Sequence, residues 1–256
     1  MKRIAFDGKT DRSKMNKPFV IIQPATSHDD LPALCAVRGD EIAWFADAFG
    51  IGRDDVLAVK VYDGEPLPDP FRIRGAIITG AIDMVTDPKP WIQHLAAWVR
   101  QTVALDVPLL GVCFGHQMLA HALGGEVGDN PGGPMFGSVG VACTGAARTD
   151  PLFEVLPADT TMHVFHYQSV LRLPVDAQVL AATPHDSHYG VRFGQSAWGV
   201  QFHPEFDREI MDRCIDTYAP AMIAAGFVPD DLRARNRDCA DGVTFLRRFK
   251  AMTDLP

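Results

Sequence analysis

The sequence predicts a three-layer α/β/α sandwich with a mostly parallel central sheet. In the first half of the chain, short apolar runs alternate with segments whose apolar residues recur at helical spacing. The apolar runs end at Pro, Gly or Asp, which is typical of strands. Gly80 and Cys113 each come directly after such a run. In parallel sheets reactive groups gather at the carboxyl ends of the strands, so we expect both residues at one sheet edge.

Each element follows from this alternation. The first half predicts strands over 19–23, 56–62, 76–79 and 107–112, and helices over 40–49, 91–105 and 115–123. The second half predicts short strands over 138–144, 162–165, 179–182, 189–193 and 197–202, followed by a helix over 207–218. We expect these later strands to be antiparallel and to extend the same core. Because no linker or repeat interrupts the chain, residues 18–256 are predicted to form a single domain, preceded by an exposed arm over 1–17.

Composition restricts the function. The 256 residues are 47% apolar and 22% charged, which is typical of a soluble globular protein. A net charge of −8 argues against nucleic-acid and anionic-membrane partners, which would require a basic face. No apolar run approaches the roughly 18–20 residues of a membrane span. The five cysteines and nine histidines show no metal-site spacing, so we expect reduced thiols, a cytoplasmic location, no metal and no cofactor.

The turn Gly-Val-Cys-Phe-Gly at 111–115 carries the first chemical signal. A residue between a strand and a helix is held in a tight bend, and flanking glycines allow the helix to approach closely. The bend would present the Cys113 thiol at a helix N-terminus, where partial positive charge favours the thiolate. The next backbone N–H, that of Phe114, can point at a developing oxyanion.

A second signal comes ninety positions later, where His203 and Glu205 follow the predicted strand 197–202. His203 can act as a general base toward Cys113 and later as an acid toward the leaving group. Residues i and i+2 of an extended segment point to the same side, so Glu205 can orient the imidazole. A thiol, an imidazole and a carboxylate together make an activated nucleophile. His116, on the predicted helix after the turn, is expected to pack behind the turn rather than to titrate.

These residues carry a resemblance to a known family. Gly-Val-Cys-Phe-Gly-His-Gln at 111–117 and Gly-Val-Gln-Phe-His-Pro-Glu at 199–205 resemble the two signatures of the class I (triad) glutamine amidotransferases. Ile-Ile-Thr-Gly-Ala-Ile-Asp-Met-Val at 77–85 and His-Tyr-Gln-Ser-Val at 166–170 are similar to two further segments of that family, as in the amidotransferase half of GMP synthase. The resemblance implies a flavodoxin-like fold and hydrolysis of L-glutamine to glutamate and ammonia through a glutamyl thioester.

The resemblance also implies roles for single residues. It makes Cys113 the nucleophile and completes the triad with His203 and Glu205. It assigns the oxyanion hole and the substrate pocket to residues that match the family's motifs: Gly80, Ala81 and Phe114 for the oxyanion hole, and Gln117, Gln168 and Ser169 for substrate binding. Because the chain has no visible domain that would consume ammonia, a separate ammonia-accepting synthetase subunit is implied.

Other functions stay open at this point. Gln168 stands where the family commonly has aspartate, which leaves room for a hydrolase of another γ-glutamyl amide, such as a γ-glutamyl-polyamine. A non-catalytic regulatory subunit would keep the fold, but packing alone does not require Cys113, His203 and Glu205 together. A cysteine peptidase of similar architecture is hard to reconcile with the Phe-His-Pro-Glu run at 202–205.

Overall fold

The computed structural model describes residues 17–254, so the predicted arm over 1–17 lies outside the described residues except for Lys17. A nine-stranded sheet forms the centre, in the order β2-β1-β3-β4-β11-β10-β9-β6-β7. The strands of this sheet are β1 (Phe19–Gln23), β2 (Val56–Lys60), β3 (Gly75–Ile78), β4 (Leu109–Val112), β6 (Met135–Cys143), β7 (Asp159–His166), β9 (Gln178–Thr183), β10 (Asp186–Arg192) and β11 (Ala197–Val200).

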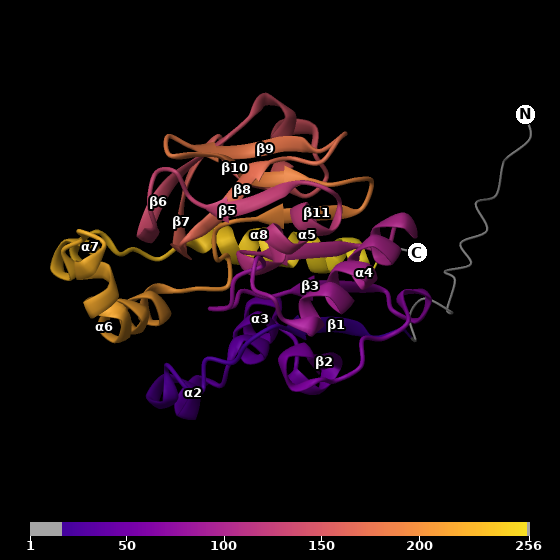
Figure 1. The fold of residues 1–256 in the computed structure, drawn as a ribbon, viewed down its shortest axis with the longest axis horizontal. Coiled ribbons are helices and arrows are strands. Elements are labelled where there is room, and N and C mark those ends of the chain that lie inside the picture. The colour runs from indigo at the N-terminus through magenta and orange to yellow at the C-terminus, as the bar shows by residue number, and fades with distance from the viewer. Residues whose placement is uncertain (1–16, 255–256) are drawn as a thin grey trace, which may run out of the picture.

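The sheet has a parallel part and an antiparallel part. Strands β2, β1, β3, β4 and β11 pair in parallel, and β10, β9, β6 and β7 continue the sheet in antiparallel pairs. Strand β11 stands at the junction, parallel to β4 on one side and antiparallel to β10 on the other. The predicted antiparallel extension of the core is confirmed. Figure 1 shows it as the upper half of the molecule, above β1, β2 and β3.

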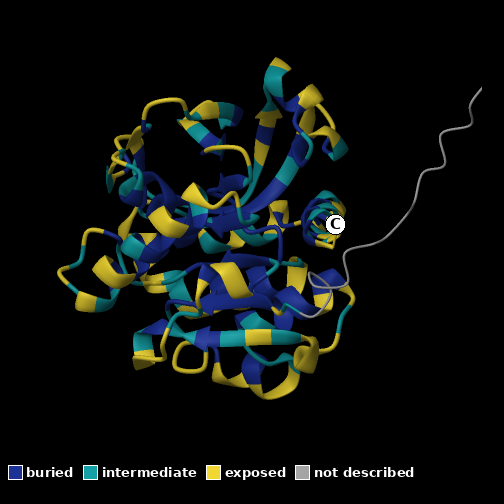
Figure 2. Ribbon diagram, turned by 90° about the vertical axis from the view of Figure 1, so that its right-hand side faces the viewer, coloured by how far each residue is buried: buried dark blue, intermediate teal, exposed yellow. Residues whose placement is uncertain are grey.

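Helices cover both faces of the sheet and make the predicted three layers. Phe19 and Ile21 of β1 pack with α3 (Glu41–Phe49) and α8 (Ala240–Thr253). The alternate residues of β1, Val20 and Ile22, pack with α4 (Pro90–Ala104) and α5 (Phe114–Ala122) on the other face. A strand buried on both faces has a continuous apolar run in its sequence, as β1 does. The central strands are correspondingly buried, while exposed residues gather on the outer helices and loops (Figure 2).

Five elements were not among the predicted ones. They are α2 (Pro32–Arg38), α7 (Pro229–Arg235), α8 and the small antiparallel sheet of β5 (Glu126–Asp129) and β8 (Gln168–Arg172). The predicted helix over 207–218 is confirmed as α6 (Arg208–Ala224) but runs six residues further, past Pro220. Helices α2, α3 and α6 enclose a third apolar cluster, which includes Leu34, Trp44 and Ile215.

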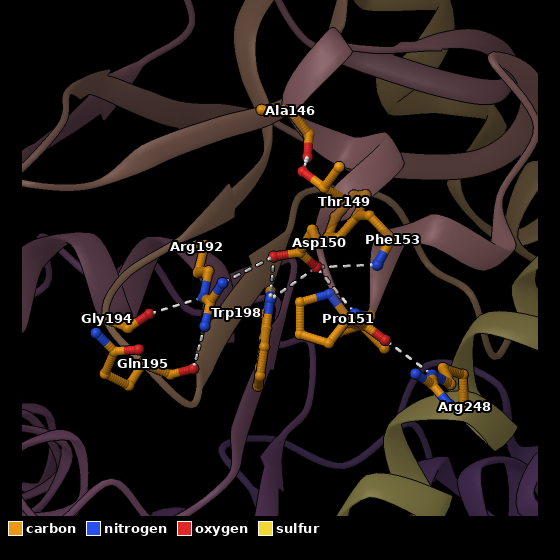
Figure 3. Close-up of polar contacts among 11 residues, drawn as sticks. Ala146, Thr149, Asp150, Pro151, Phe153, Arg192, Gly194, Gln195, Trp198 and Arg248 are labelled. Carbon is orange, nitrogen blue, oxygen red and sulfur yellow. Dashed lines mark hydrogen bonds and ion pairs between the residues drawn. The ribbon is translucent and has the colours of Figure 1, made fainter.

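A buried carboxylate ties the antiparallel part of the sheet to the α8 side. Asp150 is 3% exposed and accepts hydrogen bonds from the indole N–H of Trp198 in β11, at 3.2 Å, and from the backbone N–H groups of Leu152 and Phe153. Arg192 of β10 approaches the same carboxylate at 3.5 Å. Figure 3 shows that Arg248 of α8 reaches the carbonyl of the next residue, Pro151, and so closes the network.

Between Lys17 and Asp254, no helix has both the length and the apolar character needed to cross a membrane.

Candidate active site

The turn between β4 and α5 holds Cys113 in a strained backbone conformation at a strand-to-helix bend. Cys113 has φ 51°, a strained value for a residue with a side chain, and α5 begins at the next residue, Phe114. A Cβ atom at Gly111 would lie 2.2 Å from the Gly115 carbonyl oxygen, and one at Gly115 would lie 2.3 Å from that of Ile78. The two glycines are therefore needed for the close approach of α5 to β4 and β3.

Three contacts hold His203 in place, two to its imidazole ring and one to its backbone. Its Nδ1 lies 2.8 Å from Oε1 of Glu205, and its backbone N–H donates to the His163 carbonyl of β7, also at 2.8 Å. The ring of Phe206 stacks on it with centroids 4.1 Å apart. Because β11 ends at Val200, His203 lies beyond the strand, in an isolated antiparallel bridge with His163, and Glu205 lies in the turn that follows. The predicted contact between His203 and Glu205 is present, but the turn produces it instead of strand alternation.

The surroundings of His203 favour its protonated form. Burial by itself lowers the pKa of His203, but the charges of Glu205 and Cys113 outweigh that effect and raise the pKa to about 10. With Nδ1 engaged by Glu205, Nε2 is the nitrogen left to exchange a proton with the thiol or with a leaving group. The second oxygen of Glu205, Oε2, is buried and has no hydrogen-bond partner among the residues that the structure describes.

The thiol and the imidazole meet beside Gly80. Strands β4 and β11 are adjacent and in parallel register, with Val112 opposite Val200, so Cys113 and the segment with His203 leave the same edge of the sheet. A Cβ atom at Gly80 would lie 2.8 Å from Cε1 of His203 and 3.6 Å from Cβ of Cys113. Glycine at position 80 thus leaves the space in which the two side chains approach. The thiol also lies 3.6 Å from the Phe165 carbonyl oxygen.

The predicted oxyanion residues border the same space. Phe114 is the first residue of α5, and the first N–H groups of a helix have no acceptor within that helix. Gly80 and Ala81 form the turn after β3 and line the cavity that contains Cys113 and His203. The positions of these three residues are compatible with an oxyanion hole, and their role stays a prediction.

The three residues predicted to bind substrate belong to α5 and β8. Gln117 donates a hydrogen bond to the Gln168 carbonyl at 2.7 Å and another to Gln201 at 3.1 Å. The side chain of Gln168 contacts Thr86 and Asp129. Ser169 is buried, and its hydroxyl has no partner within 17–254. These side chains are not among those that line the cavity at Cys113, so their role in substrate binding stays a prediction.

The cavity at Cys113 extends away from these residues. It has a volume of about 60 Å³. One end lies at Cys113 and His203, and its walls are the loop after β1, the start of α3, and α6. Its wall could not be predicted from the sequence, because the wall residues come from separate segments without a motif. The missed residues are two carboxylates, Asp30 and Glu41, and two aromatic residues, Trp44 and Tyr218. Glu41, at the start of a helix, resembles any acidic residue in a first helical turn.

His116 packs behind the turn, as predicted. It is fully buried against Phe193, and burial lowers its pKa to about 4, so it is neutral at physiological pH. Among the described side chains, no group of three or more His, Cys, Asp or Glu residues is arranged to hold a metal ion.

The fold and the site together define an α/β protein with a cysteine at a strand-to-helix turn, beside a buried histidine–carboxylate pair. Residues 66–215 match the family described as glutamine amidotransferase class-I, and this match covers more than half of the chain. The chain therefore belongs to the class-I glutamine amidotransferase family, and the resemblance seen in its motifs is confirmed.

The chain is similar in sequence to two kinds of named proteins. A glutamine-hydrolyzing GMP synthase of Aeropyrum pernix is 37% identical over 154 residues, which are 58% of this chain but only 28% of that protein. Gamma-glutamyl peptidase 5 of Arabidopsis thaliana is 29% identical over 177 residues, which are 67% of this chain and 70% of the peptidase. A solved glutamine amidotransferase of Thermotoga maritima superposes with a TM-score of 0.73 at 19% identity, over 93% of this chain and 98% of that one. The predicted fold class is confirmed.

Proposed function

We propose that this protein hydrolyses the γ-amide of L-glutamine through a Cys113–His203–Glu205 triad. The observation that carries the proposal is the buried pair of His203 and Glu205, 2.8 Å apart, beside a cysteine held with positive φ at the start of α5. Burial excludes water from the imidazole and strengthens its interaction with the carboxylate. Packing does not require this combination of residue types, whereas acyl transfer does.

The reaction has two steps. The Cys113 thiolate attacks the γ-carbonyl carbon, a C–S bond forms, and the carbonyl oxygen takes negative charge opposite the N–H groups of Phe114 and the Gly80-Ala81 turn. When the C–N bond breaks, protonated Nε2 of His203 donates its proton and ammonia leaves. His203 then accepts a proton from water, which attacks the glutamyl thioester and releases glutamate and the free thiol.

We propose further that the ammonia passes to a separate synthetase. A relative from Archaeoglobus fulgidus is named as one subunit of a glutamine-hydrolyzing GMP synthase, which suggests such a division of labour in that protein. In this chain, Ile82 is 51% exposed directly after the oxyanion turn, a location where a docked protein would reach the site. The name of the Arabidopsis relative supports the second candidate function, hydrolysis of another γ-glutamyl amide.

The test is release of ammonia and glutamate from glutamine by the purified chain, together with trapping of the thioester. Acid quenching during turnover should leave a glutamyl adduct on Cys113 that mass spectrometry detects, and Cys113→Ser should abolish both the adduct and the ammonia. If glutamine is turned over equally fast by Cys113→Ser, the proposed chemistry is wrong.

A further inference from the structure

The cavity at Cys113 has the chemistry of a cation site. Three carboxylates line it, Asp30, Glu41 and Glu205, and none of the described residues that line it is Lys or Arg. Its aromatic wall consists of Trp44, Phe165, Phe206 and Tyr218. Carboxylates combined with the faces of aromatic rings are the groups that bind organic ammonium ions in proteins. A ligand with its own carboxylate would be repelled by the same wall.

Two of these carboxylates, Glu41 and Asp30, are not neutralised internally, whereas Glu205 pairs with His203. Glu41 is 8% exposed and accepts hydrogen bonds from Gln23, at 2.7 Å, and from Ser27, both neutral donors. Neither Glu41 nor Asp30 forms an ion pair with another residue of 17–254. Burial raises the pKa of Glu41, which reflects the cost of an ionised carboxylate without a cationic partner. A bound cation would remove that cost.

The acidic groups converge on one stretch of α6. Burial raises the pKa of the Cys214 thiol to about 12, and the charges of Glu41, Glu205 and Asp30 act in the same direction. Burial and then the charge of Asp30 raise the pKa of Tyr218, one turn further along the helix. All three carboxylates therefore act on the same part of the cavity, between the triad and the exposed Asp30 at the surface.

Two buried polar atoms belong to residues of the cavity wall and have no hydrogen-bond partner among the described residues. Oε2 of Glu205 is an acceptor without a donor among the described residues, although the Glu205 side chain is only 1% exposed. The indole N–H of Trp44, a residue that is 2% exposed, is a donor without an acceptor in the same part of the chain. Buried groups of this kind are uncommon in folded proteins and are normally satisfied by a bound molecule or by water. The cavity thus offers polar contacts as well as charge.

We infer that this cavity receives the leaving group of the substrate, and that the preferred substrate is a γ-glutamyl amide whose leaving amine carries a second, cationic amino group. His203 and Glu205 line the cavity, and His203 is the group that protonates the departing nitrogen in the proposed function, on which this inference rests for its reaction. The predicted acyl-binding residues Gln117 and Gln168 lie outside the cavity wall, which leaves the cavity to the amine. About 60 Å³ accommodates roughly four water-sized groups, the size of a short alkyl chain that extends toward Asp30.

The reaction is the same as with glutamine, with one change in the product. Attack by Cys113 forms the γ-glutamyl thioester, the C–N bond breaks, and His203 gives its proton to the nitrogen that leaves as a primary amine instead of ammonia. Water then releases glutamate. No oxidant, reductant or second substrate is required.

The decisive comparison uses two amides with leaving groups of equal length. The γ-glutamyl amide of putrescine ends in an ammonium group, and that of pentylamine ends in a methyl group at the same position. We expect kcat/KM of the full chain to be at least about tenfold higher for the putrescine amide, which corresponds to about 1.4 kcal/mol, and lowest for γ-glutamyl-glycine, whose leaving group is anionic. A wild-type ratio of one or less between the first two substrates overturns the inference.

Variants locate the effect. Asp30→Asn and Glu41→Gln should each lower the ratio between the putrescine and pentylamine amides, which is measured within one protein and so is insensitive to the fraction folded. Asp29→Asn is the matched control, because Asp29 is an exposed neighbour that does not line the cavity. If Asp29→Asn lowers the ratio as much as Asp30→Asn does, the preference arises from general surface charge, and the proposed cation site is wrong.

A binding measurement separates this inference from the proposed function. Calorimetry of the wild-type chain with free putrescine and with pentylamine requires no catalysis. If putrescine binds more tightly than pentylamine, and its binding weakens in Glu41→Gln, the cation site is supported. If no amide is hydrolysed at the same time, only the proposed hydrolysis is overturned. Hydrolysis of glutamine without any preference for putrescine in either assay leaves the hydrolysis standing and overturns the cation site.

Discussion

The Cys113 thiol differs from the four other cysteines in its surroundings. Burial raises the pKa of Cys35 and of Cys239 to about 11 and that of Cys214 to about 12, and burial also raises the pKa of Cys143. These four are protonated at neutral pH. Cys113 lies instead at the N-terminus of α5, beside His203 and the Gly80 backbone.

We therefore expect an electrophilic glutamine analogue, such as a diazo-ketone, to alkylate Cys113 before any other cysteine. Peptide mapping by mass spectrometry at increasing times measures the order of labelling. Iodoacetamide provides the control for reactivity without substrate recognition, and it should give the same order. Earlier labelling of Cys35, Cys143, Cys214 or Cys239 would exclude Cys113 as the nucleophile.

The two partners of the thiol should contribute unequally. In the proposed mechanism His203 transfers the proton, whereas Glu205 orients the ring and stabilises its charge through the 2.8 Å contact. General acid–base catalysis contributes on the order of 10²–10⁴-fold, so His203→Ala should lower kcat by at least that much and Glu205→Gln by less. His185→Ala, at an exposed histidine outside the site, is the control. Equal and small losses for both triad variants would remove the pair from the site.

The raised pKa of His203 makes its contribution to stability depend on pH. A group whose pKa is raised by folding stabilises the native state fully below its unfolded value, here 6.5, and loses that effect as the pH rises through the folded value of about 10. The difference in free energy of unfolding between wild type and His203→Gln should therefore decrease from pH 6.5 toward pH 10. Denaturant titrations across this range measure it, with His185→Gln as the control. A difference that grows with pH would contradict the charge assignment.

Among the elements, the network of Asp150 joins β10, β11 and the loop that α8 contacts, and it should be costly to break. Asp150→Ala leaves the indole N–H of Trp198 and two backbone N–H groups without an acceptor. Removing one partner of a buried, charged network costs about 3 kcal/mol, which urea denaturation measures. Glu154→Ala is the control from the same loop, because its pair with Arg248 is half exposed and contributes about 1 kcal/mol or less. Equal losses for both variants would mean that the network is not structural.

Many of the elements that the sequence predicts are buried in the core, although the buried helix α8 was not among them. Strands β1, β3 and β4 are apolar on both faces, and α4 has a clear apolar face, so periodicity was sufficient. Helix α7 has no buried residue and β5 is only partly buried, so neither carries a hydrophobic pattern. Helix α6 continues through Pro220, which is normally interpreted as a stop. The spacing of Phe245, Leu246 and Phe249 would have been sufficient to predict α8.

At the scale of the whole molecule, the residues of the proposed triad could be selected from the sequence, whereas the cavity beside them could not. The triad residues follow two apolar strands within recognisable motifs, whereas Asp30, Glu41 and Tyr218 come together only when α3 and α6 pack beside the edge of the sheet. Their positions along the chain show no common spacing. A motif therefore identifies the reacting groups, and the tertiary packing determines the shape and charge of the space next to them.

Coupling to a partner is also a property of the whole molecule. If the ammonia is destined for a synthetase, the isolated chain should turn over glutamine slowly, because a docked partner would complete the site around the exposed Ile82. We expect kcat on glutamine to lie below the usual enzyme range of roughly 1–10³ s⁻¹ and to rise when a co-purifying synthetase is added. Steady-state kinetics with and without that protein measure this. A kcat within the usual range that no added protein changes would instead indicate a self-sufficient hydrolase.

The parallel pairing of β4 with β11 also has a consequence for the order of events during synthesis. Val112 and Val200 are neighbours across the sheet, yet the chain between them contains four other strands of the same sheet. Contacts between residues this distant in sequence form late in folding, because a long loop must close before they can stabilise the sheet. On a ribosome, the turn with Cys113 emerges well before His203, the proposed general base. The nascent chain therefore carries an inactive thiol until β11 is inserted between β4 and β10, and assembly of the triad coincides with completion of the sheet.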